Sequence, residues 1–291
     1  QENDQTFGQA ILCWHKNSLR GNLGFIGFQN NPTAAKKLMQ EVESVAIKNN
    51  LKNIKTPVDV NFFVKYRMRL PGGKEALWGE PIYPDYYHEL LKDSGFDSIG
   101  KWDSYELQKL QGMKDYFLKR KSLVSKVDKG QEKYLNKKGD IKVRSINLKN
   151  WEQELRLIYD LFSKAYKDMP EYEALSFEQF KLIYDDFKYI MNPIYSYIVE
   201  FNKTPVAFSI NYVDPLPVLK RFAGKPLSSL QKALVFLALR LNNSKFLIAH
   251  VGKIPGPNGE EIRGVQIKVS NRISFFAIPM KKVIVTFQKE G

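Results

Sequence analysis

The feature that most constrains this fold is a recurring order of short apolar strands and amphipathic helices, separated by glycine, proline and asparagine. In each half of the chain, a predicted hairpin is followed by a helix that lies between two strands. A helix that links neighbouring parallel strands is a βαβ crossover. The order therefore predicts an α/β protein with mixed (α+β) sheets and two domains. The halves are not alike residue by residue, so we expect a repeat of topology only.

The first predicted domain covers residues 1–110. Its clearest signal is a helix start, with Asn30 or Asn31 as N-cap and Pro32 at the first helical position. Apolar residues then recur at helical spacing up to Asn49-Asn50. We expect strands over 7–16, 23–29, 54–60 and 98–107, and a second helix over 84–94.

A basic connection separates the halves. Residues 109–140 contain ten Lys or Arg against four Asp or Glu, so we place a linker at 111–140. A charge run of this kind is typical of a solvated helix and loop, and a binding patch is the alternative.

The second predicted domain covers residues 141–291. Ser176 and Gln179 have the spacing of a capping box, and Asn202-Lys203 has the composition of a tight hairpin turn. We expect strands over 141–148, 194–201, 205–212, 245–251 and 282–287. The expected helices begin at Trp151 and Ser176 and cover 228–241 and 263–278.

Composition excludes several classes of protein. The single cysteine, Cys13, cannot form an internal disulfide, and its apolar surroundings favour a core thiol over a nucleophile. No apolar run approaches the roughly 18 residues that span a bilayer. We therefore expect a soluble cytoplasmic protein without a membrane span. Three dispersed histidines predict no metal site, and no Gly-x-Ser-x-Gly or Gly-Lys-Ser/Thr motif is present.

The formal net charge of +14 suits nucleic acid, acidic membranes or phosphate-bearing ligands. The positive charge is spread along the chain and comes mostly from Lys, whereas base recognition relies more on Arg. Direct nucleic-acid binding is therefore not the favoured reading of the charge.

The order of elements in residues 141–288 resembles the GNAT acyltransferase fold, and the hairpin Tyr197–Phe208 resembles that family's second and third strands. Gly24–Phe28, Asn31–Ala35 and Tyr83–Tyr87 are similar to a pattern of bacterial tandem GNAT-like proteins of uncharacterised substrate. The resemblance implies two tandem GNAT-like domains, each incomplete at one end. The first lacks the opening strand and helices, and the second ends after its fifth strand. Truncation is the simplest explanation, and a strand borrowed from the neighbouring domain is the alternative.

The resemblance also implies a site for acetyl-CoA or another acyl-CoA in the second domain. The fourth strand would pair with the pantetheine amides, and a following helix N-terminus would hold the pyrophosphate. Arg263 fits the family's loop, whereas Gln266 and Lys268 stand where small residues are expected. A glycine turn into a helix is the alternative interpretation of Gly264. The implied cofactor-binding residues are His250, Val251, Gly252, Arg263, Gly264, Val265, Gln266, Ile267 and Lys268.

In the first domain the corresponding loop, Gln29–Pro32, lacks the motif, and Pro32 removes an N–H donor. We therefore do not expect the usual mode of CoA binding there.

Candidate substrate-binding residues come from two segments of the first domain. Tyr66 and Arg67 lie in an irregular polar-aromatic stretch, and Tyr86 and His88 lie on a predicted helix. A loop that packs its own aromatic rings is the alternative for the first pair. His250 and His88 are among the few candidates for a catalytic base or acid, and a structural histidine is the alternative for His250. The sequence does not identify the catalytic residues.

Three functions follow from these observations. The first is an acyl-CoA-dependent N-acyltransferase that acts on a small-molecule or peptide amine. The second is an aminoacyl-tRNA-dependent transferase of the same fold, because tandem domains of this kind occur in peptidoglycan-bridge enzymes and +14 suits tRNA phosphates. The third is a non-catalytic GNAT-like binding module.

Overall fold

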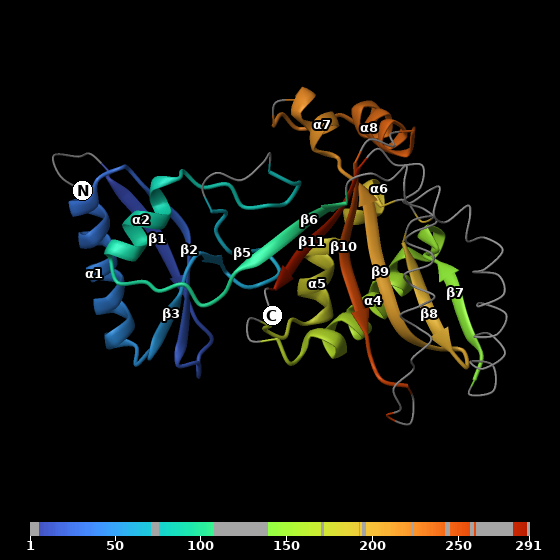
Figure 1. Ribbon diagram of the computed structural model, residues 1–291, viewed down its shortest axis with the longest axis horizontal. Coiled ribbons are helices and arrows are strands. Elements are labelled where there is room, and N and C mark those ends of the chain that lie inside the picture. Colours follow the sequence, from blue (N-terminus) through green and yellow to red (C-terminus); the bar gives the residue numbers. More distant parts are fainter. Residues whose placement is uncertain are drawn as a thin grey trace. The chain divides into compact units, whose positions relative to one another are not determined.

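The computed structural model describes residues 6–70, 76–107, 139–169, 172–191, 193, 196–222, 224–241, 245–256, 259 and 282–289 (Figure 1). The chain divides into two compact units. The first comprises residues 1–99 and 171–173, and the second comprises 100–170 and 174–291. The predicted mixed α/β class is confirmed, because helices pack on sheets that combine parallel and antiparallel pairs.

The first unit is built on a three-stranded sheet of order β1-β2-β3. β2 pairs antiparallel with β1 and parallel with β3, and the helix α1 connects the parallel pair. The predicted βαβ crossover is therefore present in this unit. Its elements are β1 (Gly8–Cys13), β2 (Arg20–Phe28), α1 (Pro32–Lys48), β3 (Asn53–Lys55), β4 (Val58–Asp59), β5 (Lys65–Tyr66) and α2 (Tyr86–Asp93).

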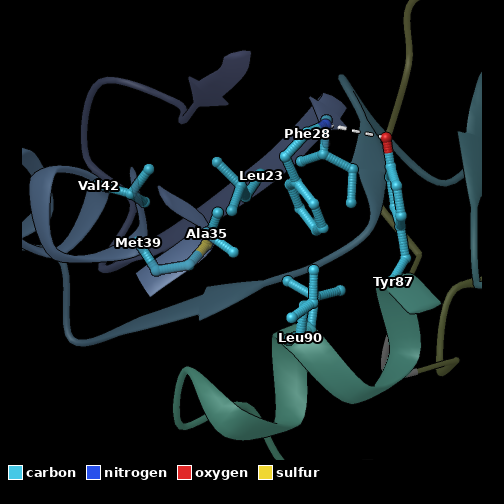
Figure 2. Close-up of a cluster of buried hydrophobic side chains, with 9 residues drawn as sticks. Leu23, Phe28, Ala35, Met39, Val42, Tyr87 and Leu90 are labelled. Atoms are coloured by element: carbon cyan, nitrogen blue, oxygen red, sulfur yellow. Dashed lines mark hydrogen bonds between the residues drawn. The ribbon is translucent and has the colours of Figure 1, made fainter. Parts of the chain in front are cut away.

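Local sequence signals account for α1 and its packing. The Asn31 side chain accepts a hydrogen bond from the Ala34 N–H at 3.1 Å, and Pro32 begins the helix as predicted. The apolar face of α1 packs with β2 and α2 in one core, part of which Figure 2 shows. The Tyr87 hydroxyl accepts a hydrogen bond from the Phe28 N–H at 2.9 Å. The buried members are Leu23, Ile26, Phe28, Ala35, Met39, Val42, Tyr87, Leu90 and Leu91.

The predicted strand over 54–60 is wrong as a single element. β3 ends at Lys55, and β4 begins at Val58 in a separate two-stranded piece with β5. Pro57 lies between them, and a proline has no N–H with which to continue a ladder.

The second unit is built on a six-stranded sheet of order β6-β11-β10-β9-β8-β7. Only β10 and β11 run parallel, and the other neighbours are antiparallel. Its strands are β6 (Trp102–Leu107), β7 (Ile141–Ser145), β8 (Tyr197–Phe201), β9 (Thr204–Val213), β10 (Lys245–Lys253) and β11 (Lys282–Lys289). Its described helices are η1 (Leu148–Asn150), α4 (Trp151–Tyr166), α5 (Phe177–Tyr184), α6 (Phe187–Ile190), α7 (Leu216–Leu219), η2 (Lys220–Phe222) and α8 (Ser229–Leu241).

Two local predictions in this unit are confirmed. Asn202 and Lys203 have φ angles of 49° and 66°, the left-handed conformation that a two-residue hairpin turn requires. The Ser176–Gln179 capping box opens α5. The helix that follows Ser176 ends at Tyr184, and α6 follows as a separate turn. The predicted helix over 263–278 lies outside the described residues.

The strand predicted to close the first domain belongs to the second unit. β6 pairs antiparallel with β11, from Trp102 opposite Lys289 to Leu107 opposite Val283. The units therefore divide between residues 99 and 100, whereas the first predicted domain extends to 110. A strand joins the sheet that offers it a hydrogen-bonding edge, and sequence distance does not decide this. β11 is thus paired on both sides, with β10 on one and with β6, which precedes the rest of the sheet in the chain, on the other.

Candidate functional site

The parallel strands β10 and β11 share only a short ladder. Lys245–Ile248 of β10 pair with Lys282–Val285 of β11. β10 then continues along β9 to Lys253, while β11 continues along β6 to Lys289. The two strands diverge in Figure 1. The ladder between β10 and β11 therefore ends at Ile248, whereas the ladder between β10 and β9 continues to Lys253.

A β-bulge lies where the strands part. The pairing of β10 with β9 shifts between Ile248 and His250, so that β10 carries one extra residue. Bulges redirect side chains and are frequent beside active sites. The His250 ring lies 5.7 Å from the ring of Phe162 and 6.3 Å from that of Tyr184.

His250 borders an apolar recess between α4, α5, α6 and the sheet. The other lining residues are Trp151, Leu155, Ile158, Phe162, Phe180, Tyr184, Phe187, Met191 and Ile210. The recess has a volume of about 20 Å³, which is room for about one water molecule, so it is too small to hold a substrate group in this conformation.

Gly252 allows α4 to approach β10 closely. A Cβ at this position would lie 2.8 Å from Cζ of Phe208 and 3.1 Å from Cβ of Ala165. Phe208 is fully buried and cannot yield space cheaply. A side chain at this position would therefore separate α4 from the strand.

The end of α4 is tied to the same stretch of β10. The Tyr166 hydroxyl donates a hydrogen bond to the Val251 carbonyl at 3.1 Å. Burial raises the pKa of Tyr166 to about 12. The phenol therefore keeps its proton at neutral pH and acts as a donor. His250, Val251 and Gly252 thus lie together at the bulge, as expected for consecutive residues of one strand, with Tyr166 as a neighbour that the sequence did not single out.

In the first unit the corresponding edge is occupied by the chain itself. β2 and β3 also form a short parallel ladder, Arg20–Asn22 with Asn53–Lys55. Beyond it β4 lies against β2, so closely that a Cβ on Gly24 would lie 2.5 Å from Cα of Asp59. The Phe25 N–H donates to Oδ1 of Asp59 at 2.6 Å. The segment around β4 therefore already occupies this edge of β2.

The predicted substrate residues belong to the first unit, whereas His250–Gly252 belong to the second. The Arg67 guanidinium lies 4.2 Å from the centre of the Tyr66 ring, which itself stacks near Phe62. The Tyr86 hydroxyl donates to the Phe28 carbonyl at 2.9 Å, so it ties α2 to β2. His88 is partly exposed, with Nδ1 3.3 Å from Oε1 of Glu89. Substrate binding by these four residues stays a prediction.

Sequence reasoning missed a polar cluster in the first unit. Oε1 of Glu173 accepts hydrogen bonds from Nη2 of Arg20 at 2.9 Å and from Nδ2 of Asn22 at 2.8 Å. Nε2 of His15 lies 3.6 Å from Oε2 of the same carboxylate. Glu173 is about 150 residues away in sequence and carries no motif, so no local signal could have paired it with β2.

The remaining cofactor-binding candidates, Arg263–Lys268, lie outside the described residues. Among the residues that the structure describes, no group of three or more His, Cys, Asp or Glu could hold a metal ion. No described helix is long and apolar enough to cross a membrane. Comparison with protein-family models found no match, and comparison with curated proteins found none either.

Proposed function

We propose that the second unit is a GNAT-like acyltransferase domain and that the protein transfers an acyl group from a CoA thioester to an amine. The observation that carries this proposal is the parting of β10 and β11 after a four-residue parallel ladder. The four strands β7, β8, β9 and β10 are each antiparallel to the next and precede β11 in the chain, as in the family that the sequence resembles. In this proposal the β10 backbone beyond Ile248, where the ladder with β11 has ended, pairs with the amides of a pantetheine chain, which need backbone partners of this kind.

In this proposal His250 is the general base. It takes a proton from the acceptor amine as the new C–N bond forms and the thioester C–S bond breaks. The imidazolium then returns a proton to the leaving thiolate, so that the protons balance. The apolar rings of Phe162 and Tyr184 beside His250 would keep water from the acyl group. Tyr166 is a positioning residue, because its hydrogen bond fixes Val251 next to the base.

The first unit has a structural role in this proposal. β4 and Asp59 occupy the edge of β2 that corresponds to the edge of β10 beyond Ile248. A ligand could pair there only if it displaced the bond between Phe25 and Asp59.

Ligand binding is tested by thermal unfolding with acetyl-CoA, with CoA and without either. A ligand at about 100 times its Kd adds about 2.7 kcal/mol to stability, which shifts the Tm by several degrees. Hydrogen exchange of a peptide covering residues 249–253 should slow at the same time, because its amides gain partners. A saturable Tm shift without protection of β10 would contradict binding at this edge.

Catalysis is tested by replacing the base. His250→Ala should abolish acyl transfer and leave the Tm shift by CoA intact, whereas His15→Ala, on an exposed histidine of the first unit, should change neither. Full activity of His250→Ala would refute the assigned role of His250.

The net charge of +14 favours one further candidate, transfer from an aminoacyl-tRNA. In that case tRNA affinity should fall steeply as salt rises, and CoA should leave the Tm unchanged. Salt-insensitive or absent tRNA binding would exclude it.

A further inference from the structure

One helix of the second unit presents a row of leucines to solvent. Leu230, Leu234, Leu237 and Leu241 of α8 are 71%, 54%, 53% and 77% exposed. Their spacing of four, three and four residues places them on one face of an α-helix. Single exposed leucines are common on protein surfaces, but a continuous row along a whole helix is typical of an interaction surface.

The opposite face of α8 already serves the fold. Val235 and Leu239 are 7% and 3% exposed, and α8 packs against α6 and α7. The helix is therefore apolar on two faces, although only one of them is covered in the described structure. A helix that is apolar all round is normally buried, so the leucine row indicates a second partner.

The charge around the row narrows the choice of partner. The segment from Leu216 to Leu241 contains Lys220, Arg221, Lys225, Lys232 and Arg240 and no Asp or Glu. Lys220, Arg221, Lys225 and Lys232 are exposed. A second copy of the chain would bring like charges together, whereas an anionic surface would attract them.

We propose that α8 binds the surface of an anionic lipid bilayer, with the leucine row in the acyl-chain boundary and the neighbouring basic side chains at the headgroups. An amphipathic helix with this pattern lies in the plane of the interface. Its binding is favoured both by the burial of its apolar side chains and by the attraction between its basic side chains and the anionic headgroups. The proposed attachment is interfacial, because the exposed leucines of α8 lie on one face of the helix. The proposal does not depend on acyl transfer by the same unit.

The test measures binding of the full-length protein to vesicles of phosphatidylcholine alone and of phosphatidylcholine with 30% phosphatidylglycerol. We expect binding to the anionic vesicles only, and a loss of binding as salt rises from about 0.1 M to 0.5 M, where charge screening becomes stronger. Equal binding to both vesicles, or to neither, would overturn the proposal.

Paired variants separate the contribution of the leucines to vesicle binding from that of the basic side chains. The double variant Leu234→Asp/Leu237→Asp should weaken vesicle binding on the order of 100-fold, because two leucines no longer enter the apolar region. Leu182→Asp replaces a leucine on α5 that is 86% exposed, and it should leave binding unchanged.

The charge variant Lys220→Glu/Lys225→Glu/Lys232→Glu should weaken binding on the order of 100-fold as well. A control of equal net charge, Lys36→Glu/Lys37→Glu/Lys48→Glu, changes three exposed lysines of α1 and should have a smaller effect. Equal losses in both triple variants would mean that total charge, and not α8, governs binding, which overturns the proposal.

Two other occupants of the leucine row give distinct results. If a second copy covers it, the protein dimerises in size-exclusion chromatography and the Leu234→Asp/Leu237→Asp variant is monomeric. If the chain itself covers it, the single variant Leu234→Asp lowers the Tm by several degrees without vesicles present. Either result would refute membrane docking.

Discussion

Replacing Gly252 by alanine tests how closely α4 packs on the proposed cofactor strand. The added methyl group would overlap the ring of Phe208, with Cζ at 2.8 Å, and would lie 3.1 Å from Cβ of Ala165. Phe208 is fully buried beneath Phe162 of α4, with ring centres 5.8 Å apart. The ring therefore cannot rotate away without disturbing its neighbours.

The magnitude follows from two opposing effects. Overpacking of a well-packed core costs about 1–3 kcal/mol. The smaller conformational freedom of alanine in the unfolded chain returns about 0.4–1 kcal/mol. Displacement of α4 would also strain the hydrogen bond from Tyr166 to Val251, which contributes about 1 kcal/mol. We expect a net loss of about 2 kcal/mol and a fall in Tm of about 4–8 °C.

Hydrogen exchange measured by mass spectrometry can localise this loss. Peptides of β9 and β10 should exchange faster in Gly252→Ala, while peptides of β1 and β2 serve as an internal reference from the other unit. Gly27→Ala is the matched control, because its Cβ would lie 3.5 Å from Cγ of the exposed Gln9 and should change stability by less than about 0.5 kcal/mol. Unchanged protection of β9 and β10 in Gly252→Ala would refute the packing argument.

Three further predictions concern single polar groups. Tyr166→Phe should cost about 1 kcal/mol of stability at neutral pH, because the hydrogen bond to Val251 is lost. The raised pKa of Tyr166 stabilises the fold below about pH 10, and this contribution disappears towards pH 12. Denaturant titrations of the variant should therefore show a shallower loss of stability at alkaline pH. A hydrogen bond from Lys188 lowers the pKa of Asp185, against the effect of burial, and Trp151 lowers it further, so this stabilisation is complete at neutral pH and is lost below about pH 4. Asp185→Asn should therefore flatten the acid limb of a stability profile followed by Trp fluorescence, and an unchanged limb would contradict the assignment. Glu173→Ala should destabilise the first unit by about 1–3 kcal/mol, since the buried Asn22 loses one of its two acceptors and Arg20 loses its carboxylate partner, and proteolysis of that unit should accelerate.

Elements with strong local signals could be predicted well from the sequence. Asn31 and Pro32 mark the start of α1, Ser176 and Gln179 cap α5, and the Asn202-Lys203 turn sets the hairpin of β8 and β9. In each case the residues that make the decisive contact lie within three or four positions of one another. Their hydrogen bonds or backbone angles therefore depend little on the rest of the chain.

The candidate site could be predicted only in part. The sequence pointed to His250, Val251 and Gly252 through a resemblance, but the bulge at His250 and the end of the ladder at Ile248 depend on pairing with β9 and β11. Tyr166 carries no motif, and its role arises from the approach of α4 that Gly252 permits. Pocket walls and strand divergence are properties of packing between distant segments.

Sequence by itself determined the alternation of strands and helices, the absence of a second cysteine and the basic character of the chain, because periodicity, composition and caps are local quantities. Tertiary structure decided that β6 completes the second sheet, that Pro57 interrupts the strand expected over 54–60, and that Glu173 returns to Arg20 and Asn22. These outcomes depend on which edges and buried polar groups find partners far along the chain. The free energy of such pairings includes burial and loop closure, which no local pattern of residues encodes.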